Sequence, residues 1–513
     1  MALTVALGWP FVKRLGIEVD EALIAAGIYE RAAPWYSWRI AGGELPIMML
    51  TYLGALKTWM YNAVFAIWAP GQVSLRLPTL LIAAAALPLF FVLVNRILDR
   101  RSAWIATALL AADPAYVMNG AIDFGPVALQ HAFKIGALLL LVEYHRRPSA
   151  AKLAGGFFLF GVALWDKAVF VWVLVGLACA SLVIWREVRP HLTGRNFAIA
   201  AGAFLVGAAP LIVYNIQRPL ETFTTTVRLA PDNPHIKLLL LARTLNGSAA
   251  FGYFTAPDLG PHPGVPTTWL GQASFAIARA TGEPWSSLLG WATLAAILAT
   301  PLLSGTRAFR PAVFSIVAMA AIWIQMFFTN GAGGAMHHVI LLWPFHLVVI
   351  AAVLTRVPAR PAVAMAALLA ASELLALNSY YVNLTRNGAG ARWTDASNGL
   401  HRFLSQTKAP LIVTADWGIL ETQILLSEGG LPIEDASAPL RAAERPEFRE
   451  QLARLVTAEG ALFIAHGEAY EQAAGSRAKL NAFAAALGYA PQPVQTIQDR
   501  NGRPVFEIFR YRR

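Results

Sequence analysis

The sequence predicts a mainly α-helical polytopic membrane protein, in which a transmembrane helical bundle is followed by a small soluble α/β domain. Three observations predict this fold class. First, 57% of the 513 residues are hydrophobic, only 14% are charged and the mean hydropathy is +0.52, which excludes a water-soluble globular enzyme. Second, several uncharged stretches have the length that a helix needs to cross a bilayer. Third, the composition becomes that of a soluble domain after Tyr380.

Uncharged stretches of about 20 residues define the strongest predicted spans. They are Leu77 to Asn95, Asn196 to Gln217, Trp285 to Thr306 and Pro311 to Thr329. Further spans, which carry a few polar residues, are predicted at Ser102 to Ile122, Phe124 to Val142, Leu153 to Trp165, Ala168 to Trp185, Val339 to Thr355 and Pro361 to Leu377. The total is about ten, or about eleven with Met1 to Val12. That segment is too short to span alone, so either the true N-terminus is longer or neighbouring helices complete a short first helix.

Lysine and arginine residues occupy every second connection between the predicted spans. Because short basic loops are retained in the cytoplasm, this pattern indicates the orientation of the chain. The basic connections contain Arg96, Arg100 and Arg101; Arg146, Arg147 and Lys152; Arg186, Arg189 and Arg195; Arg307 and Arg310; and Arg356 and Arg360. The other connections and the tail are then predicted to lie outside. Short loops and a compact outer tail favour a bacterial inner membrane, with an archaeal membrane as the alternative.

Residues 1–380 are predicted to form the membrane domain and residues 381–513 a soluble extracytoplasmic domain, where charges are mixed through apolar periodicity. The predicted helices are Asp395 to Gln406, Leu420 to Ser427, Pro446 to Thr457 and Ser476 to Leu487, and the predicted strands are Pro410 to Ala415 and Ala461 to Ala465. A closing hairpin joins Val494 to Gln498 with Val505 to Tyr511, and Asn501-Gly502 between them is a favoured tight-turn pair.

The distribution of charge does not indicate a nucleic-acid partner, and the cysteine count excludes a disulfide within the chain. The 41 basic and 30 acidic residues give a net charge of +11, but the basic residues are spread over the connections between spans. A nucleic-acid partner would need them clustered on one soluble face, so none is predicted, and membrane lipids are the expected surroundings. The single cysteine, Cys179, allows no disulfide within the chain.

Ionisable residues gather at the predicted outer face. They are Glu18, Asp20, Glu21, Glu44, Arg76, Asp123, Asp166, Lys167, His337 and His338. A carboxylate here can accept the proton of an attacking hydroxyl, and cations opposite it can stabilise the charge that develops on a phosphate. The combination suits group transfer from a lipid phosphate donor, in which the phosphate leaves without a general acid.

Each of these residues also has a purely structural interpretation. Acidic loop residues such as Asp20 and Glu21 are often only solvated, whereas Asp123 lies near membrane depth, where a charge is costly and indicates function. Asp113 and Lys134 lie deeper in neighbouring spans, where pairing with each other is one structural explanation for them. Adjacent histidines on a helix point in different directions, so at least one of the pair at 337–338 is expected to be a packed interface residue.

The order of these residues resembles the multi-spanning GT-C glycosyltransferases, and within them glycosyltransferase family 39, the protein O-mannosyltransferases and lipid A aminoarabinose transferases. The resemblance covers about residues 13 to 360 and depends on order and topology rather than on one motif. The stretches that carry it are Val19-Asp20-Glu21-Ala22, Glu44-Leu45-Pro46-Ile47, Ser74-Leu75-Arg76-Leu77-Pro78, Arg100-Arg101, Ile122-Asp123-Phe124, Trp165-Asp166-Lys167, Gly334-Ala335-Met336-His337-His338 and Trp343-Pro344.

This resemblance implies an inverting transfer at the periplasmic face, from a polyprenyl-phosphate-linked sugar donor to a lipid, glycan or protein acceptor. It implies that Asp20 is the catalytic base, Glu21 its acidic neighbour and Asp123 a second acidic residue. It further implies that Arg76 contacts the donor phosphate or the acidic pair, that Lys167, His337 and His338 contact the donor phosphate, and that Glu44 contacts donor or acceptor. Two departures stand out: Asp166-Lys167-Ala168 replaces the Thr-Lys-Gly of the family, and the histidines replace a frequent lysine, arginine or tyrosine.

Three other interpretations remain open at the level of sequence. A transporter or flippase of a lipid-linked saccharide would favour inverted repeats with broken helices, which the sequence does not indicate. A membrane scaffold that presents the soluble domain leaves the one-sided acidic cluster unexplained. No cofactor is expected to be required, but a divalent ion held by Asp20, Asp123 and His337 is a variant of the enzyme hypothesis. The soluble domain is expected to bind the acceptor or to support a lid.

Overall fold

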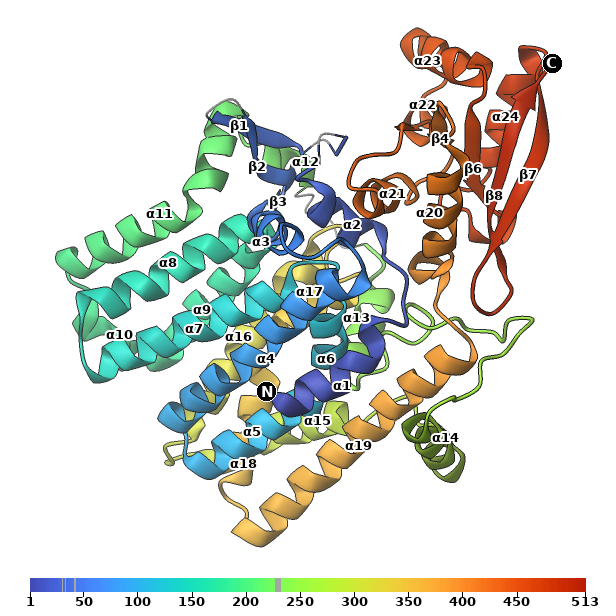
Figure 1. Cartoon of the computed structure of the whole chain (residues 1–513). Helices are drawn as coiled ribbons and strands as arrows, with labels where there is room; N and C mark the ends of the chain where they lie inside the picture. Colours follow the sequence, from blue (N-terminus) through green and yellow to red (C-terminus); the bar gives the residue numbers. More distant parts are fainter. Residues whose placement is uncertain (30, 33, 41–42, 227–231) are drawn as a thin grey trace.

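The computed structural model describes residues 1–29, 31–32, 34–40, 43–226 and 232–513. Figure 1 shows a bundle of long helices, with a smaller domain of helices and strands packed at one end of it. Chain segments far apart in sequence meet at that end, where the blue N-terminal helices lie beside the orange C-terminal ones. The predicted helical bundle with a small C-terminal α/β domain is therefore confirmed.

Six helices among the described residues are long and apolar enough to span a membrane. Five are α4 (Gln72–Ile97), α7 (Val127–Arg146), α11 (Gly194–Gln217), α16 (Phe309–Phe328) and α19 (Ala359–Arg386), and the sixth, Ala168–His191, combines η1 (Ala168–Phe170), α9 (Val171–Ser181), η2 (Leu182–Ile184), α10 (Trp185–Val188) and η3 (Arg189–His191). A bent pair, Met336–Leu342 with Phe345–Leu354, gives a seventh and contains α17 (Met336–Val339), η5 (Ile340–Leu342) and α18 (Phe345–Leu354). The chain is therefore a multi-pass membrane protein.

The remaining predicted spans are helical but short or broken. The segment after Trp285 forms α15 (Leu289–Ala299) and η4 (Thr300–Leu303), and the segment before Trp165 forms α8 (Ala150–Asp166). The segment after Ser102 is divided into α5 (Arg100–Ala112) and α6 (Pro114–Ala121), and Met1 to Val12 forms the short apolar helix α1 (Ala2–Val12). The count of full-length spans is thus six or seven, lower than the predicted ten or eleven, because these short helices complete the bundle.

The division between α5 and α6 has a specific chemical cause. Asp113 ends α5 and caps α6, because its Oδ1 accepts hydrogen bonds from the amides of Ala115 (2.7 Å) and Tyr116 (3.1 Å). Its Oδ2 accepts a 2.5 Å hydrogen bond from the indole of Trp343. Lys134 instead donates to the carbonyl of Leu341 at 2.7 Å. Asp113 and Lys134 therefore do not pair with each other, and each has other partners.

A small antiparallel sheet that the sequence analysis did not predict lies between α2 (Val19–Ala26) and α3 (Leu56–Phe65). It consists of β1 (Tyr36–Ile40), β2 (Gly43–Leu50) and β3 (Leu53–Gly54). Its buried residues Ile47 and Met48 pack with Trp165 at the end of α8 and with Tyr214 of α11. The sheet therefore fixes the loop between α2 and α3 onto the helix ends at one face of the bundle.

Three further helices lie in the described part of the long connection between α11 and α15. They are α12 (Glu221–Thr226), α13 (Pro234–Leu245) and α14 (Trp269–Thr281). Lys237 of α13 donates to three carbonyls, those of Met326, Phe327 and Thr329, at the end of α16. This connection is therefore anchored to the same face of the bundle as the small sheet.

The C-terminal domain is a five-stranded mixed sheet with the order β5-β4-β6-β8-β7. The strands are β4 (Ile412–Thr414), β5 (Ile433–Asp435), β6 (Leu462–His466), β7 (Ala490–Gln498) and β8 (Pro504–Arg512). The helices are η6 (Ala391–Trp393), α20 (Ala396–Thr407), α21 (Leu420–Leu426), α22 (Ser437–Arg441), α23 (Pro446–Thr457), η7 (Glu468–Tyr470) and α24 (Ser476–Ala486). Each predicted element is present within a few residues, while β5 and α22 were not predicted.

One hydrophobic core joins the N-terminal segment to the C-terminal domain. Residues of α2 such as Ile24 are buried in the same cluster as Leu400 of α20, Ile424 of α21 and Ile464 of β6. In addition, the helix α19 continues to Arg386, past the predicted boundary at residue 380. The segment around α2 therefore packs as part of the C-terminal domain, although the two are separated by the whole bundle in sequence.

Candidate active site

The first acidic residues form the start of helix α2. Glu18 is the N-cap: its carboxylate accepts the amide of Asp20 at 2.7 Å, and its own amide donates to Glu21 at 3.4 Å. This reciprocal arrangement is a capping box, which satisfies two of the unpaired amides at a helix start. Glu18 and Glu21 are therefore held by the helix itself, while the Asp20 side chain is left to project from its first turn.

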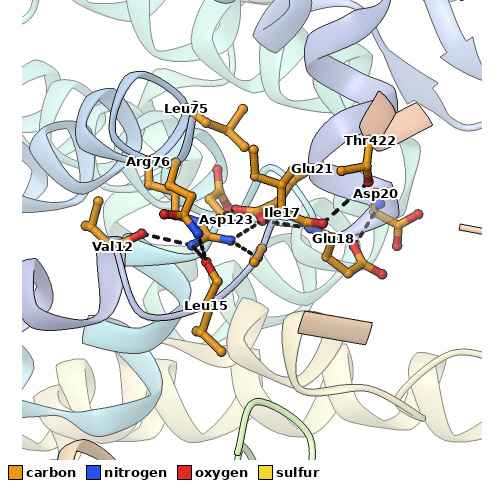
Figure 2. Close-up of polar contacts among 12 residues, drawn as sticks. Val12, Leu15, Ile17, Glu18, Asp20, Glu21, Leu75, Arg76, Asp123 and Thr422 are labelled. Atoms are coloured by element: carbon orange, nitrogen blue, oxygen red, sulfur yellow. Dashed lines mark hydrogen bonds and ion pairs between the residues drawn. The ribbon is translucent and has the colours of Figure 1, made fainter. Parts of the chain in front are cut away.

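Arg76, in the first turns of α4, is completely buried and uses all of its N–H groups. Its Nε and one terminal nitrogen donate to the two oxygens of Glu21, at 2.9 and 2.7 Å. Its other N–H groups donate to the carbonyls of Val12, Leu15 and Gly16, at 2.9, 2.8 and 2.6 Å. Figure 2 shows this arrangement. Because a guanidinium has five N–H donors, none is left for a donor phosphate.

This geometry corresponds to the second of the two expected contacts of Arg76, that with the acidic pair. The ion pair joins two side chains of which at most 2% is exposed. Glu21 is equally committed, since its two oxygens accept from Arg76 and from the amide of Glu18. The structure therefore does not favour phosphate binding by Arg76 or proton transfer by Glu21, and gives both a part in holding the loop that carries Asp20.

Asp123 lies in the connection between α6 and α7. One of its oxygens accepts the amides of Val127 (2.6 Å) and Ala128 (3.3 Å) at the start of α7, and the other is 3.1 Å from the Nζ of Lys57. Lys57 also donates to the backbone carbonyl of Asp123. Both side chains are at most 2% exposed. Asp123 thus caps a helix and neutralises a buried lysine that the sequence analysis did not select.

Lys167 follows α8 and is positioned by the small sheet. It forms an isolated bridge with Leu53, and the next amide, that of Ala168, donates to the carbonyl of Tyr52 at 2.9 Å. Gly54 permits this approach, because a Cβ there would lie 2.3 Å from the carbonyl oxygen of Trp165. In the described part of the chain, the ammonium group of Lys167 has no hydrogen-bond or ion-pair partner, although Asp20, Asp123 and Asp166 all act on it electrostatically.

Gly125 provides the room for the ammonium group of Lys167. A Cβ at this position would lie 2.9 Å from Lys167 Nζ and 3.1 Å from the ring of His337. His337 stacks edge-on with Phe124, with ring centroids 4.7 Å apart, and with His338 at 4.3 Å. Lys167 and His337 are therefore neighbours, as the predicted phosphate site requires. His338 instead has its ring edge-on to that of Trp172, with centroids 6.3 Å apart.

Asp20 differs from the other carboxylates of this cluster. Within the described residues its side chain accepts no hydrogen bond and forms no salt bridge of 4.0 Å or less, and it is only partly buried. In Figure 2 its carboxyl group points away from Arg76. Burial raises the pKa of the Asp20 carboxyl above its usual value, Lys167 and Arg392 oppose this rise, and Glu21 adds to it.

Arg392 is a further cation that acts electrostatically on Asp20, and it was not among the predicted site residues. Its guanidinium lies over the ring of Trp417 at 5.2 Å and donates to Gln472 at 3.0 Å. The loop before α2 is tied to this region, because the amide of Gly16 donates to the carbonyl of Trp393 at 2.7 Å. A narrow cavity between loop and domain is lined by Glu18, Arg392, Trp417 and His466, among others. The C-terminal domain therefore contributes to the surroundings of Asp20.

Two predicted groupings are not formed. Glu44 is exposed on β2, opposite Arg39 in the strand register, and does not join the buried cluster. No set of three or more histidine, cysteine, aspartate or glutamate side chains able to hold a metal is found in the described ranges. Asp20, Asp123 and His337 are therefore not gathered as the metal ligands that the sequence analysis considered.

The chain is similar to known glycosyltransferases in part of its sequence and in its fold. Residues 54–214 match a family model described as dolichyl-phosphate-mannose-protein mannosyltransferase. The structure is similar to the crystal structure of ArnT from Cupriavidus metallidurans bound to undecaprenyl phosphate, with a TM-score of 0.60 and 13% identity over 99% of this chain and 96% of that chain. The chain has the GT-C glycosyltransferase fold. The resemblance to GT-C enzymes is therefore confirmed.

Weaker similarities to GT-C structures accompany this one and add nothing to the assignment. ArnT from Cupriavidus metallidurans in the apo state aligns with a TM-score of 0.49 and 14% identity, over 99% of this chain and 96% of that chain. The Archaeoglobus fulgidus oligosaccharyltransferase in complex with zinc and sulfate aligns with a TM-score of 0.48 and 14% identity, over 90% of this chain and 68% of that chain. No curated protein sequence matches this chain.

Proposed function

We propose that the chain is an inverting glycosyltransferase that moves a sugar from a polyprenyl-phosphate-linked donor to a lipid, glycan or protein acceptor. The observation that carries this proposal is the contrast within the acidic cluster. Glu21 and Asp123 are committed to buried arginine and lysine partners. Asp20 and Lys167, a carboxylate and a cation that act on each other electrostatically, have side chains without hydrogen-bond partners among the described residues.

In the proposed reaction the acceptor hydroxyl oxygen attacks the anomeric carbon of the donor sugar, and Asp20 takes the proton of that hydroxyl. The bond between the anomeric carbon and the phosphate oxygen breaks, and the polyprenyl phosphate leaves with the electron pair. Lys167, which is buried, and Arg392, which is exposed, stabilise the negative charge that develops on this phosphate. Attack from the side opposite the leaving group inverts the anomeric configuration.

The fold and the charge pattern support the nature of the donor and the side of the membrane. The ArnT structure, which has the same fold, is bound to undecaprenyl phosphate. Short basic loops are retained in the cytoplasm, and the site lies at the helix ends away from the basic connections. We therefore propose a periplasmic site in a bacterial inner membrane, with residues 1–380 as the membrane domain and residues 381–513 as an extracytoplasmic domain that helps to bind the acceptor.

The direct test is sugar transfer in proteoliposomes that contain the purified full-length chain and one of a panel of polyprenyl-phosphate sugars. Transfer from one donor to an added lipid or peptide acceptor would support the proposal and identify the sugar. Movement of the donor across the bilayer without any transfer would contradict it in favour of a flippase. Repeating the assay with a chelator tests the metal-dependent variant, in which transfer would be lost and then restored by a divalent ion.

Replacing Lys167 with methionine is expected to weaken donor use about 10- to 100-fold, because charge-assisted hydrogen bonds to a phosphate contribute about 1.5–3 kcal/mol. The loss should appear mainly as a higher KM for the donor. Lys13→Met, which removes an exposed lysine from the same face, is the matched control and should leave the KM unchanged. An unchanged KM in Lys167→Met would remove this residue from the donor site.

The pH dependence of transfer is expected to follow Asp20. The pKa of its carboxyl is raised above the usual value of about 4. Asp20 is therefore protonated, and can no longer act as the base, at a higher pH than an ordinary aspartate. The sign for stability is opposite: the folded chain binds the proton more tightly than the unfolded chain, so protonation of this group does not destabilise the fold. Transfer should therefore decline with acid before the chain unfolds. Coincident loss of transfer and of structure would contradict this assignment.

A further inference from the structure

A large cavity of about 1860 Å³ lies in the half of the bundle opposite Asp20 and Lys167. Helix α7 starts beside Asp123 and ends at Arg146, where the cavity opens, and 20 helical residues span about 30 Å. Its lining residues come from α4, α7, α8, α9, α11, α16 and α18, and Figure 1 shows most of these helices in the left half of the bundle. It is therefore separate from the site proposed for sugar transfer.

The walls of this cavity are apolar. They include Phe157, Phe160, Leu174, Leu177, Phe204 and Phe314, which come from α8, α9, α11 and α16. Pockets for small molecules usually measure about 300–1,000 Å³, so this one is larger than a drug-sized ligand needs. Because the lining helices are membrane spans, hydrocarbon chains are the apolar material available to fill it.

The rim of the cavity is basic. The described lining includes four arginines, Arg96, Arg146, Arg307 and Arg310, and one acidic residue, Glu187. Arg96 pairs with Glu143 at 2.6 Å, and Arg310 pairs with Glu187.

Arg146 and Arg307 are exposed and form no ion pair with any residue that the structure describes. His145 Nδ1 and His191 Nε2 lie 3.2 Å apart at the same rim. An apolar cavity with two uncommitted arginines at its mouth is complementary to a molecule with hydrocarbon chains and an anionic head.

We propose that this cavity binds an anionic phospholipid, with its acyl chains along the apolar walls and its phosphate at Arg146 and Arg307. Basic pockets between spans on the cytoplasmic side suit such head groups, and the positive connections place this rim in the inner leaflet. The site takes no part in sugar transfer. The bound lipid contacts the ends of α7, α11 and α16 that line the cavity, and so completes the packing of the bundle.

The test measures lipid binding to the purified full-length chain by titration with native mass spectrometry. Phosphatidylglycerol is expected to bind the wild type at least tenfold more tightly than phosphatidylcholine. Combined Arg146→Ala and Arg307→Ala substitutions should abolish this preference by lowering the affinity for phosphatidylglycerol about tenfold or more. The matched control is Arg186→Ala with Arg195→Ala, which removes the same charge from exposed positions outside the cavity and should bind as the wild type does.

Two further binding measurements identify the lipid that the cavity prefers. Phosphatidylglycerol with very short acyl chains should bind more weakly than the long-chain lipid, because it leaves the apolar walls unfilled. Equal affinities of the rim and control variants for phosphatidylglycerol would overturn the proposal, as would a lack of chain-length dependence. Tighter retention of polyprenyl phosphate than of phosphatidylglycerol, lost in the rim variant, would assign the cavity to the sugar carrier and overturn it too.

Discussion

Asp20→Asn is expected to reduce sugar transfer about 100- to 10,000-fold, the range over which a positioned general base accelerates a reaction. The amide has almost the shape of the carboxylate but cannot accept the proton of the acceptor hydroxyl. Its effect on folding should be small, because no described residue forms a hydrogen bond with the Asp20 side chain. The variant should therefore retain the thermal unfolding temperature of the wild type and still bind the donor.

The measurement is the initial rate of transfer in proteoliposomes at matched protein density, together with thermal unfolding in detergent. Asp258→Asn, an exposed aspartate in the loop after α13, is the control with the same change of charge and should transfer normally. If Asp20→Asn transfers as fast as this control, Asp20 is an ordinary solvated loop residue. If only Asp123→Asn loses transfer while it remains folded, the base is Asp123 and the proposed division of tasks in the cluster is wrong.

Arg76→Ala is expected to lower the free energy of unfolding by about 3–5 kcal/mol, the usual effect of removing one partner of a buried ion pair. The substitution leaves Glu21 charged and without its partner, and it frees the carbonyls of Val12, Leu15 and Gly16. Arg76→Lys should recover only part of the loss, because a lysine has three donors and lacks the planar fork. Thermal unfolding in detergent checks both variants.

The competing prediction comes from the family resemblance, which also allowed Arg76 to contact the donor phosphate. In that case Arg76→Ala would unfold at the wild-type temperature and would raise only the KM for the donor. Arg449→Ala, at an exposed position on α23, is the control for loss of an arginine and should be neutral. Glu21→Gln should behave like Arg76→Ala in the unfolding experiment, since it breaks the same pair from the other side.

The fold class followed from hydropathy and periodicity because the length of an apolar run determines whether a helix can span. The elements of the C-terminal domain were equally predictable, since turn residues such as Asn501-Gly502 and the proline that opens α23 mark their ends. The small sheet β1–β3 was missed because its strands are short and lie in a connection. Its stability comes from packing on α8 and α11 rather than from a pattern within its own sequence.

For the candidate site, the sequence predicted which residues gather at one face of the bundle, but it did not predict which of them form pairs. Arg76, Glu21 and Asp123 were selected for their charge, and only the structure shows that this charge is already neutralised. Lys57 had a usable signal, a lone lysine in the apolar stretch between β2 and α4. Arg392 had none, because one arginine among many in a soluble domain is not distinctive until its neighbours in space are known.

The core shared by α2 and the C-terminal domain determines which truncations and chimaeras of this chain can fold. Removing residues 381–513 would expose Ile24 and its neighbours, so the segment that carries Asp20 would lose its support together with the domain. Loss of activity in such a truncation would therefore report a misplaced N-terminal loop as much as a missing acceptor site. A chimaera that exchanges the C-terminal domain with that of a protein of the same fold should carry residues 13–60 with it, because α2 and the C-terminal domain share one hydrophobic core.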